Sequence, residues 1–469
     1  MEKLKECIRQ NGYIQEMLRL RGDRDIYLVG GTVRNILMGI EPQDYDFSVS
    51  GSGIDFARHV VNKVGGALVI LDEDEDEARV VKDNVVYDFI GFNERGIVTD
   101  LQRRDFTINA MAVQLERLEF VDPCQGAQDL KREIIRPTMP QSLIDDPLRI
   151  LRGFRFALEL RFRLHKDFYK LAKNISLKDI AAERIGYELM RIMSAPSSFE
   201  VVLKMNQLGI FKQLFPEAEK LLEDFDLWDH SLNTYGAVEH LIEKGFFTKL
   251  EPECSQYFAK PNRIPLCKLA GLFHDVAKPD TFLLKEGEVH FYGHDTLGAR
   301  MIEKIARRRL RLSRQDTDIL TKLVKEHMRL HLLATNPDLT DRAIRRFFRH
   351  LEDDWFGAMM IAWADGYATG GKTRHLEKAF LRMIELLRAD RAKPKVDRLV
   401  NGHDLIALGM KPGPLFKIIL QELLDLQLEG ALKEKAEALR TAVEIAEKVV
   451  KKSGQEGQQN AKKENKHAQ

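Results

Sequence analysis

The chain has few cysteines and lacks any long apolar run. Its four cysteines, Cys7, Cys124, Cys254 and Cys267, lie far apart among 469 residues. Because no two of them form a Cys-x-x-Cys pair, we expect neither a disulfide framework nor a thiolate zinc site. No stretch reaches the roughly 18 consecutive apolar residues that a membrane span needs, and residues 1–17 are too polar for a secretory signal. These absences predict a cytosolic protein with no membrane segment.

The chain also lacks a net charge of either sign. It has 73 Lys and Arg against 72 Asp and Glu, which leaves a formal charge of +1. With 31% charged and 44% hydrophobic residues, it is neither a disordered chain nor a uniformly basic coat for nucleic acid. Local basic patches are present, however, over residues 131–166, 304–314 and 342–349. These patches fit salt-dependent contacts with RNA phosphates, and they fit equally well as solvated helix faces paired with nearby acids.

The first part of the chain mixes two kinds of pattern. Up to about Glu119, short β-type runs alternate with helical stretches, whereas from about Ser142 nearly every segment is amphipathic at helical spacing. The expected strands are 26–29, 44–49, 67–71, 85–92 and 111–115. The pattern therefore predicts an α+β protein, with an α/β head followed by a mostly helical remainder. Its length suggests about three units.

One group of residues in the head has the composition of a phosphate and metal site. The expected strand 26–29 runs into Gly30 and Gly31 before a helix, where backbone N–H groups can approach a phosphate, although a plain strand-to-helix turn explains the glycines equally well. Asp44 and Asp46 lie two residues apart on a strand, so both carboxylates point to one face. A pair of Mg²⁺ ions would neutralise them, with Asp88 as a third carboxylate on another strand. The alternative is solvent-facing acids on a strand edge.

Two further motifs suit a nucleoside triphosphate. In residues 103–112, RRDFTINAMA, Arg104 suits phosphate oxygens, while Asp105 and Asn109 suit ribose hydroxyls. In residues 145–155, DDPLRILRGFR, three arginines recur every third residue and line one side of a helix, separate from its apolar face. We expect these arginines to be free to bind an anion, and a solvated basic face is the alternative.

Together these motifs resemble a known family. GGTVRN, DYDF, RRDFTINAMA and DDPLRILRGFRF, in this order and spacing, resemble bacterial tRNA nucleotidyltransferases and their poly(A) polymerase relatives, within the polymerase-beta-like nucleotidyltransferase superfamily. The resemblance is close over residues 20–195. It implies an enzyme that uses CTP, ATP and Mg²⁺ to add CMP and AMP to the 3′ end of tRNA without a nucleic-acid template. The tRNA 3′-hydroxyl would attack the α-phosphate, and pyrophosphate would leave.

The resemblance also implies a role for each motif residue. Asp44 and Asp46 would hold the metal ions, with Asp88 as the third catalytic carboxylate. Asp146 would accept a hydrogen bond from the exocyclic amine of the incoming base and Arg149 would donate to its ring, which selects C or A over U or G. Arg184 matches the next family element, where we expect a structural or helix-capping role. The nucleotide-binding residues would be Gly30, Gly31, Arg34, Arg104, Asp105, Asn109, Asp146, Arg149, Arg152 and Arg155.

The sequence departs from the family pattern in three places. Asn35 stands where the family usually has Asp, and Asp145 where it usually has Glu. The stretch 93–102 is shorter than in full CCA-adding members and resembles that of enzymes that add only the two cytidines, so CC-only addition stays open.

The acidic run 72–77 is expected to form a solvated hairpin tip, because six like charges could not be buried.

A second group of residues lies in the helical part. His274 and Asp275 are adjacent on an apolar run, so both can bind one metal only near a helix end. With His230 upstream and Asp365 downstream they resemble the H…HD…D set of HD phosphohydrolases, to which His294 and His327 add two imidazoles. Such nitrogen and oxygen ligands suit Mn²⁺, Fe²⁺, Ni²⁺ or Mg²⁺, whereas each histidine alone is explained as an ordinary core or surface residue.

The resemblance divides the chain and leaves three hypotheses. We expect a nucleotidyltransferase head over 1–119, a helical neck over 120–195, an HD-type body over 196–370, a helical tail over 371–452 and a disordered polar tail over 453–469. The leading hypothesis is a tRNA nucleotidyltransferase with a secondary metal-dependent phosphohydrolase activity. The alternatives are a poly(A) polymerase, and an HD phosphohydrolase whose head only binds nucleotides.

Overall fold

The computed structural model describes residues 1–92, 96–244, 247, 250–392, 397–428 and 430–447. The chain forms two compact units. The first comprises Met1–His327 and Phe356–Gly371, and the second Met328–Trp355 and Lys372–Gln469. Both candidate sites belong to the first unit. Among the described residues, no helix combines the length and hydropathy needed to cross a membrane.

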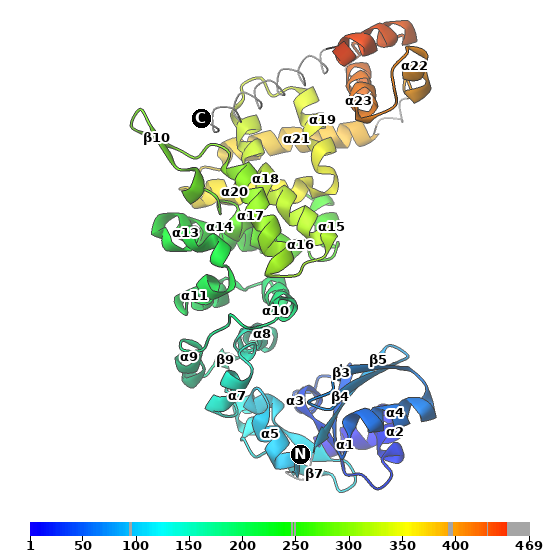
Figure 1. Ribbon diagram of the computed structural model, residues 1–469, viewed down its shortest axis with the longest axis vertical. Helices are drawn as coiled ribbons and strands as arrows, with labels where there is room; N and C mark the ends of the chain where they lie inside the picture. Colours follow the sequence, from blue (N-terminus) through cyan, green and yellow to red (C-terminus); the bar gives the residue numbers. More distant parts are fainter. Residues whose placement is uncertain (93–95, 245–246, 248–249, 393–396, 429, 448–469) are drawn as a thin grey trace, which may run out of the picture. The chain divides into compact units, whose positions relative to one another are not determined.

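A seven-stranded sheet forms the N-terminal part of the first unit (Figure 1). The strands β2 and β5 pair in parallel, and the neighbouring pairs on either side are antiparallel. The parallel register places Asp46 beside Asp88. In sheet order the strands are β3 (Ala67–Asp72), β4 (Glu77–Lys82), β5 (Val85–Phe92), β2 (Asp44–Ser50), β1 (Ile26–Val29), β6 (Ala112–Gln114) and β7 (Glu119–Val121).

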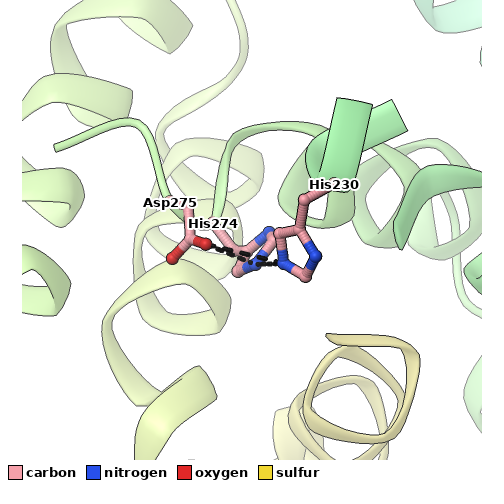
Figure 2. Close-up of side chains that lie close together, drawn as sticks. All are labelled: His230, His274 and Asp275. Atoms are coloured by element: carbon pink, nitrogen blue, oxygen red, sulfur yellow. Dashed lines mark hydrogen bonds and ion pairs between the residues drawn. The ribbon is translucent and has the colours of Figure 1, made fainter. Parts of the chain in front are cut away.

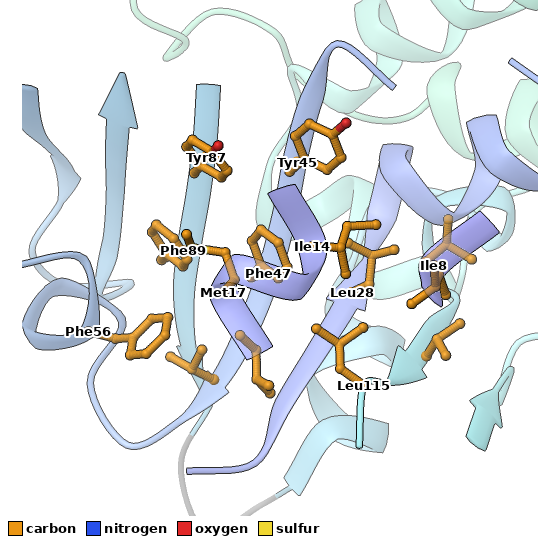
Figure 3. Close-up of a cluster of buried hydrophobic side chains, with 14 of the residues drawn as sticks. Ile8, Ile14, Met17, Leu28, Tyr45, Phe47, Phe56, Tyr87, Phe89 and Leu115 are labelled. Atoms are coloured by element: carbon orange, nitrogen blue, oxygen red, sulfur yellow. The ribbon is translucent and has the colours of Figure 1, made fainter. Parts of the chain in front are cut away.

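Alternation along β2 separates the core from the polar site. Tyr45, Phe47 and Val49 are buried on one face, where Phe47 stacks on Phe89 of β5 at 5.5 Å between ring centroids. The helices α1 (Glu2–Gln10), α2 (Gly12–Leu20) and α4 (Gly53–Val64) contribute apolar side chains to the same core (Figure 3). The intervening residues Asp44 and Asp46 therefore point to the opposite face.

Helices dominate the chain after the sheet. The helices of the first unit that position the sites are α3 (Gly30–Leu37), α5 (Gly96–Arg103), α7 (Pro140–Asp145), α8 (Arg149–Leu160), α10 (Ala182–Ser194), α14 (Phe225–Glu243), α16 (Arg263–Phe273), α17 (His294–Arg308), α18 (Arg314–Thr335, which runs on into the second unit) and α20 (Trp355–Ala368, whose first residue belongs to the second unit). Shorter elements connect them: α6 (Gly126–Lys131), α9 (Lys166–Ala172), α11 (Phe199–Gln207), α12 (Ile210–Leu214), α13 (Glu219–Glu223), α15 (Glu253–Phe258), and the paired strands β8 (Ile134–Ile135) with β9 (Arg163–Leu164) and β10 (Leu283–Lys285) with β11 (Glu288–His290).

The predicted α+β class is confirmed, and several predicted segments coincide with observed ones. The strands 26–29 and 85–92 have the predicted bounds. The strand predicted at 111–115 is shorter and runs over Ala112–Gln114. The β10–β11 hairpin was missed because its apolar residues are exposed and carry no amphipathic signal. The predicted disordered tail, 453–469, lies outside the described residues.

The second unit contains α19 (Asp341–Leu351), α21 (Arg374–Ala392), α22 (Gly402–Ala407) and α23 (Pro414–Leu428). Three of the four arginines of α19 pair with acids of this unit. Arg342 donates to Glu422 at 2.8 Å and Arg345 to Asp390 at 2.6 Å, while Arg349 pairs with the buried Asp425. These pairs hold α19 against α21 and α23. For these three residues the alternative of helix faces paired with nearby acids holds.

Candidate active site and metal centre

The turn after β1 brings the backbone close to charged side chains. Gly30 has a φ of +66°, and a Cβ atom there would lie 2.9 Å from Arg104 Nη1 and 3.1 Å from Asp46 Oδ2. Gly31 is less crowded, because the atom nearest to its Cβ position, Asp46 Oδ2, lies at 3.4 Å, an ordinary contact distance. Glycine is therefore favoured at position 30, by the positive φ and by the close approach. The start of α3 lies where an anion would meet a helix N-terminus and a guanidinium together.

Asp44 and Asp46 occupy the polar face of β2 as predicted. Asp46 is half-buried, its backbone N–H donates to Thr32 Oγ1 at 2.8 Å, and its Oδ2 lies 3.4 Å from the same hydroxyl. Burial raises the pKa of Asp46 and the neighbouring Asp88 raises it further, while Arg104 opposes both. A carboxylate in such surroundings is stabilised by a bound cation, so the face fits a divalent ion.

Asp88 is held by a residue that the sequence did not indicate. Arg79 of β4 lies directly opposite it and donates from Nε and Nη2 to the two carboxylate oxygens, each at 2.8 Å. This bidentate hydrogen bond raises the pKa of Arg79. Asp88 therefore shares a face with Asp46 as expected, and in this structure it is paired with a guanidinium.

The acidic run before β4 is only partly a solvated tip. Residues 72–75 are exposed, as expected. Asp76 instead accepts hydrogen bonds from Ser52 Oγ and from the N–H groups of Gly53 and Ile54, and so caps α4. Glu77 is half-buried, and its pKa is raised by burial and by Asp88. The expectation is wrong for these two residues because the sheet folds the end of the run back over α4 and the polar face.

Two predicted phosphate-binding arginines are held in place by hydrogen bonds to neighbouring side chains. Arg34 donates from Nη1 to Asn109 Oδ1 at 2.6 Å and from Nη2 to Asn35 Oδ1 at 2.9 Å. Arg104 donates from Nη2 to Ser48 Oγ and to Asp100 Oδ2, each at 3.1 Å. Each guanidinium thus has a fixed orientation at the glycine turn, and the departure at Asn35 supplies a neutral acceptor in place of a carboxylate.

Asp105 is engaged entirely by the protein. Its Oδ1 accepts from Phe106 N at 2.7 Å and Asn109 Nδ2 at 3.0 Å, and its Oδ2 accepts from Arg152 Nε at 3.1 Å and Nη2 at 2.7 Å. Burial alone would raise the pKa of Asp105, but Arg152 and Asn109 outweigh it, with a contribution from Arg149, and lower it to about 2. The carboxylate therefore joins the RRDFTINAMA segment to α8. Each of its oxygens already accepts two hydrogen bonds from the protein, so neither is left for a ribose hydroxyl.

Two of the three arginines of α8 are not free, so that expectation is wrong for Arg152 and Arg155 and stays a prediction for Arg149. Arg152 pairs with Asp105, and Arg155 is buried, donating to Glu188 at 2.6 Å and Glu159 at 2.8 Å. Arg149 donates from Nη1 to the carbonyl oxygens of Arg103 and Ser142, each at 2.9 Å. Its remaining N–H groups make no hydrogen bond with the described residues. The sequence shows the spacing of these cations but not the acids and carbonyls that the fold brings to them.

Asp146 and Arg149 lie side by side at the start of α8. Arg149 Nε is 3.9 Å from Asp146 Oδ2. Asp146 Oδ1 accepts from Leu148 N at 3.2 Å, and Oδ2 accepts from Arg184 Nη2 at 2.8 Å. Arg184 was expected to be structural, and its contact with Asp146 could not be read from a position 38 residues away.

The other basic patches combine exposed and paired cations. Arg136 pairs with the buried Asp129 at 3.0 Å, Arg309 with Glu217 at 2.8 Å and Arg311 with Glu183 at 3.2 Å. For these arginines the alternative of helix faces paired with acids holds. The patches are therefore less basic than their sequences suggest.

A second site gathers six predicted residues from five helices. His274 and Asp275 follow directly after α16, so both reach the same point although they are adjacent, as expected for a helix end. His230 comes from α14 and Asp365 from α20. His294 begins α17 and His327 lies on α18.

Asp275 lies between two pairs of ligands. Its Oδ2 is 3.2 Å from His274 Nε2 and 3.6 Å from His230 Nε2 (Figure 2). Its Oδ1 is 3.6 Å from His294 Nε2 and 3.7 Å from His327 Nε2. Asp365 Oδ1 lies 3.1 Å from His230 Nε2, on the first side. Two groups of three ligand atoms, each within 4.8 Å, thus share Asp275.

The donor chemistry of this site fits a divalent ion. Both carboxylate oxygens of Asp275 are buried, and Oδ2 lies 2.5 Å from Lys278 Nζ, so its charge is compensated inside the site. Backbone carbonyls accept from Nδ1 of His274, His294 and His327, so each Nε2 is left facing the site. Burial alone would lower the pKa of His274, but Asp275 and Asp365 raise it to about 10. Because Lys278 already pairs with Asp275, the fit to a cation rests on the nitrogen and oxygen ligand atoms that converge on Asp275.

Three family models match the chain. A poly A polymerase head domain matches residues 26–136, a probable RNA and SrmB-binding site of polymerase A matches residues 162–222, and an HD domain matches residues 227–369. The first covers the glycine turn, the three head carboxylates and the RRDFTINAMA segment. The third covers all six residues of the second site.

Curated relatives resemble the chain over most of its length. An A-adding tRNA nucleotidyltransferase of Deinococcus radiodurans is 31% identical over 425 residues, 88% of this chain and 93% of that protein. A CC-adding tRNA nucleotidyltransferase of Geobacter sulfurreducens is 28% identical over 435 residues, 90% of this chain and 92% of that protein. The fold resembles that of the Thermotoga maritima CCA-adding enzyme complexed with tRNA, with a TM-score of 0.66 at 22% identity over 94% of this chain and 97% of that one.

Proposed function

Because the chain belongs to the family of tRNA nucleotidyltransferases and poly(A) polymerases, we propose that it transfers CMP or AMP from CTP or ATP to the 3′ end of tRNA. The observation that carries the proposal is the polar face of β2, where Asp44 and Asp46 lie beside the glycine turn and two fixed arginines. tRNA is favoured over other RNA because tRNA nucleotidyltransferases match about nine-tenths of the chain.

The residues of the head divide the work of phosphoryl transfer. Asp44 and Asp46 would hold Mg²⁺, which supplies charge neutralisation at the triphosphate when bound. The turn at Gly30 and Gly31, with Arg34 and Arg104, would orient the triphosphate for in-line attack. The bond from the RNA 3′-oxygen to the α-phosphorus forms as the bond to the pyrophosphate oxygen breaks. Asp88, beside Asp46, is the third carboxylate of this proposal.

Base selection falls to Asp146 and Arg149. A carboxylate accepts from the amine of C or A, and a guanidinium donates to the neighbouring ring nitrogen. U and G would place a carbonyl oxygen against the carboxylate. Asp105 and Asn109 then support the nucleotide site indirectly. Asp105 fixes α8 through Arg152, and Asn109 orients Arg34. We leave Arg155 out of the nucleotide site because Glu188 and Glu159 enclose it.

Incorporation assays on tRNA transcripts test the proposal. Transcripts ending before the CCA sequence, after one C and after both Cs are each incubated with labelled CTP, ATP, or both. CMP addition to the first two, AMP addition only to the third, or addition at every stage distinguishes CC-adding, A-adding and CCA-adding activity. Runs of AMP on unrelated RNA would instead indicate a poly(A) polymerase. No incorporation with any transcript would refute the proposal.

Paired variants locate the chemistry. Asp46→Ala is expected to abolish incorporation, because it removes a metal-holding carboxylate from the polar face. Glu73→Ala is the matched control, since it removes an exposed acid in the same head. Full activity of Asp46→Ala would exclude this face as the site.

The second site favours an additional activity. We propose that it binds one or more divalent ions and hydrolyses phosphoester bonds, with water attacking phosphorus and the ester oxygen leaving. The supporting observation is that two groups of three possible ligand atoms, each group within 4.8 Å, share Asp275. The protein should bind Mn²⁺ or Ni²⁺ in equilibrium dialysis, and Asp275→Ala should lose that binding and hydrolysis of a model phosphodiester while keeping nucleotide transfer. His375→Ala, which changes an exposed histidine, is the control. Unchanged metal binding in Asp275→Ala would exclude the site.

A further inference from the structure

The two base-reading residues of the proposed function carry opposite charges and lie almost in contact. Arg149 Nε and Asp146 Oδ2 are 3.9 Å apart, only about 1 Å beyond hydrogen-bond length. If they paired directly, the acceptor of one and the donors of the other would satisfy each other. A base edge would then find neither group available.

Arg149 is restrained on its own side. Both hydrogens of Nη1 are used by the carbonyl oxygens of Arg103 and Ser142, each at 2.9 Å. These carbonyls belong to the backbone of α5 and α7, so the guanidinium cannot follow a moving partner without losing two hydrogen bonds. Something bound to Asp146 must therefore keep its carboxylate from closing the remaining gap to Arg149.

Asp146 is restrained at both oxygens. Leu148 N–H, two residues along the same segment, binds Oδ1 at 3.2 Å. Arg184, on the first turn of α10, binds Oδ2 at 2.8 Å, which is the same oxygen that faces Arg149. Of these two donors only Arg184 is charged and comes from another element. It therefore competes directly with Arg149 for that oxygen.

The position of Arg184 is itself fixed by packing. The helix α10 packs against α8, and Gly186, two residues after Arg184, lies so close to the backbone of Leu310 that a Cβ there would be 1.9 Å from its carbonyl oxygen. The Arg184 side chain is 53% exposed, and Asp146 is its one side-chain partner among the described residues. Its backbone is anchored by the packing of α10, and its side chain reaches the same carboxylate oxygen that faces Arg149.

We propose that Arg184 is a positioning residue that determines base specificity by holding the Asp146 carboxylate apart from Arg149 and oriented as an acceptor. This inference rests on the proposed function, because it concerns how the same site reads a base. Each held oxygen of Asp146 retains a lone pair that an exocyclic amine can use. With the carboxylate charged and fixed, the carbonyl oxygen of U or G meets repulsion.

Loss of Arg184 has a specific consequence. Without its cation, Asp146 turns toward Arg149 and the two form a direct ion pair. A correct base must then break that pair, so the KM of the correct nucleotide rises. A wrong base no longer meets a preorganised carboxylate, so it is rejected less strongly. We expect the advantage of the correct nucleotide in kcat/KM to fall at least about tenfold, since one good pair of base contacts discriminates by about that factor or more.

Steady-state transfer with the full chain tests this inference. For wild type, Arg184→Met and Arg184→Lys, kcat and KM are measured for whichever of CTP or ATP the wild type uses, and for UTP and GTP. Arg184→Met is expected to raise KM for the correct nucleotide and to lower its preference at least about tenfold, while Arg184→Lys, which keeps the cation, retains most of the preference. Arg191→Met is the matched control, because Arg191 lies on the same helix and pairs with Glu159.

Each outcome decides a different statement. If Arg184→Met folds and keeps the wild-type preference for the correct nucleotide, the inference about Arg184 is overturned while the proposed function stands. A lower KM for the correct nucleotide would also overturn the inference, because it would mean that Arg184 competes with the base. Absence of all transfer by the wild type would overturn the proposed function together with it. A melting temperature for each variant separates a folding defect from a change in selection, and Arg184→Lys provides the second variant if Arg184→Met does not fold.

Discussion

Asp105 provides a direct test of the physical account of the head and α8. The substitution Asp105→Asn keeps the size of the side chain and removes its charge. It leaves Arg152 without the carboxylate that accepts two hydrogen bonds at 3.1 and 2.7 Å. Because Asp105 is almost fully buried, at 6% exposure, water has little access to the carboxylate side of this pair.

The magnitude follows from the pKa of Asp105. The folded structure lowers it from 3.8 to about 2. A difference of that size corresponds to roughly 2–3 kcal/mol of stability at neutral pH. Because the folded pKa lies below the unfolded one, this contribution is complete above about pH 4 and is lost as the pH falls toward 2. Asp105→Asn lacks the contribution at every pH.

Urea unfolding followed by circular dichroism measures the effect. At pH 7 we expect the free energy of unfolding of Asp105→Asn to be about 2–3 kcal/mol below that of wild type, and at pH 3 the difference should be smaller. Asp55→Asn is the control, because Asp55 forms an exposed pair with Arg58 and should cost less than about 1 kcal/mol. Equal stabilities at pH 7, or a difference that does not shrink in acid, would refute the reasoning.

Two further predictions concern packing in the first unit. Gly186→Ala should lower the free energy of unfolding by about 2–3 kcal/mol, because its Cβ would lie 1.9 Å from the backbone oxygen of Leu310. Gly12→Ala is the control and should not lower it, because a Cβ there meets no atom within 4 Å. Equal melting temperatures of the two variants would contradict this prediction. Lys268→Met should cost about 3 kcal/mol or more, because the buried Lys268 donates to Glu239 at 2.8 Å and to Ala195 O at 2.7 Å. Adding Glu239→Gln should recover part of that loss in the same unfolding assay, since the carboxylate is then no longer left without its cation.

The sequence predicted the elements whose signals are local. Alternation along β2 gave both its buried face and the common face of Asp44 and Asp46, and the adjacency of His274 and Asp275 gave the helix end after α16. The family resemblance indicated six residues that the fold then gathered from five helices. None of these inferences required knowledge of a distant partner.

The predictions failed where a partner comes from another element. Arg152 and Arg155 of α8 looked free because their acids lie tens of residues away, as Asp105 does from Arg152 and Glu188 from Arg155. Asp76 looked like part of a charged tip until the sheet placed it at the start of α4. Arg79 gave no signal at all, since only the register of β4 and β5 sets it opposite Asp88.

The sequence by itself therefore determined which residues are available for chemistry and on which kind of element each one lies, because periodicity and adjacency are properties of the local chain. Only the tertiary structure decided which of these charges are already neutralised within the protein and which remain to meet a ligand. Neutralisation depends on distances of about 3 Å between atoms that are far apart in sequence. That is why Asp105 became a structural anchor and Asp275 the shared member of two groups of candidate metal ligands.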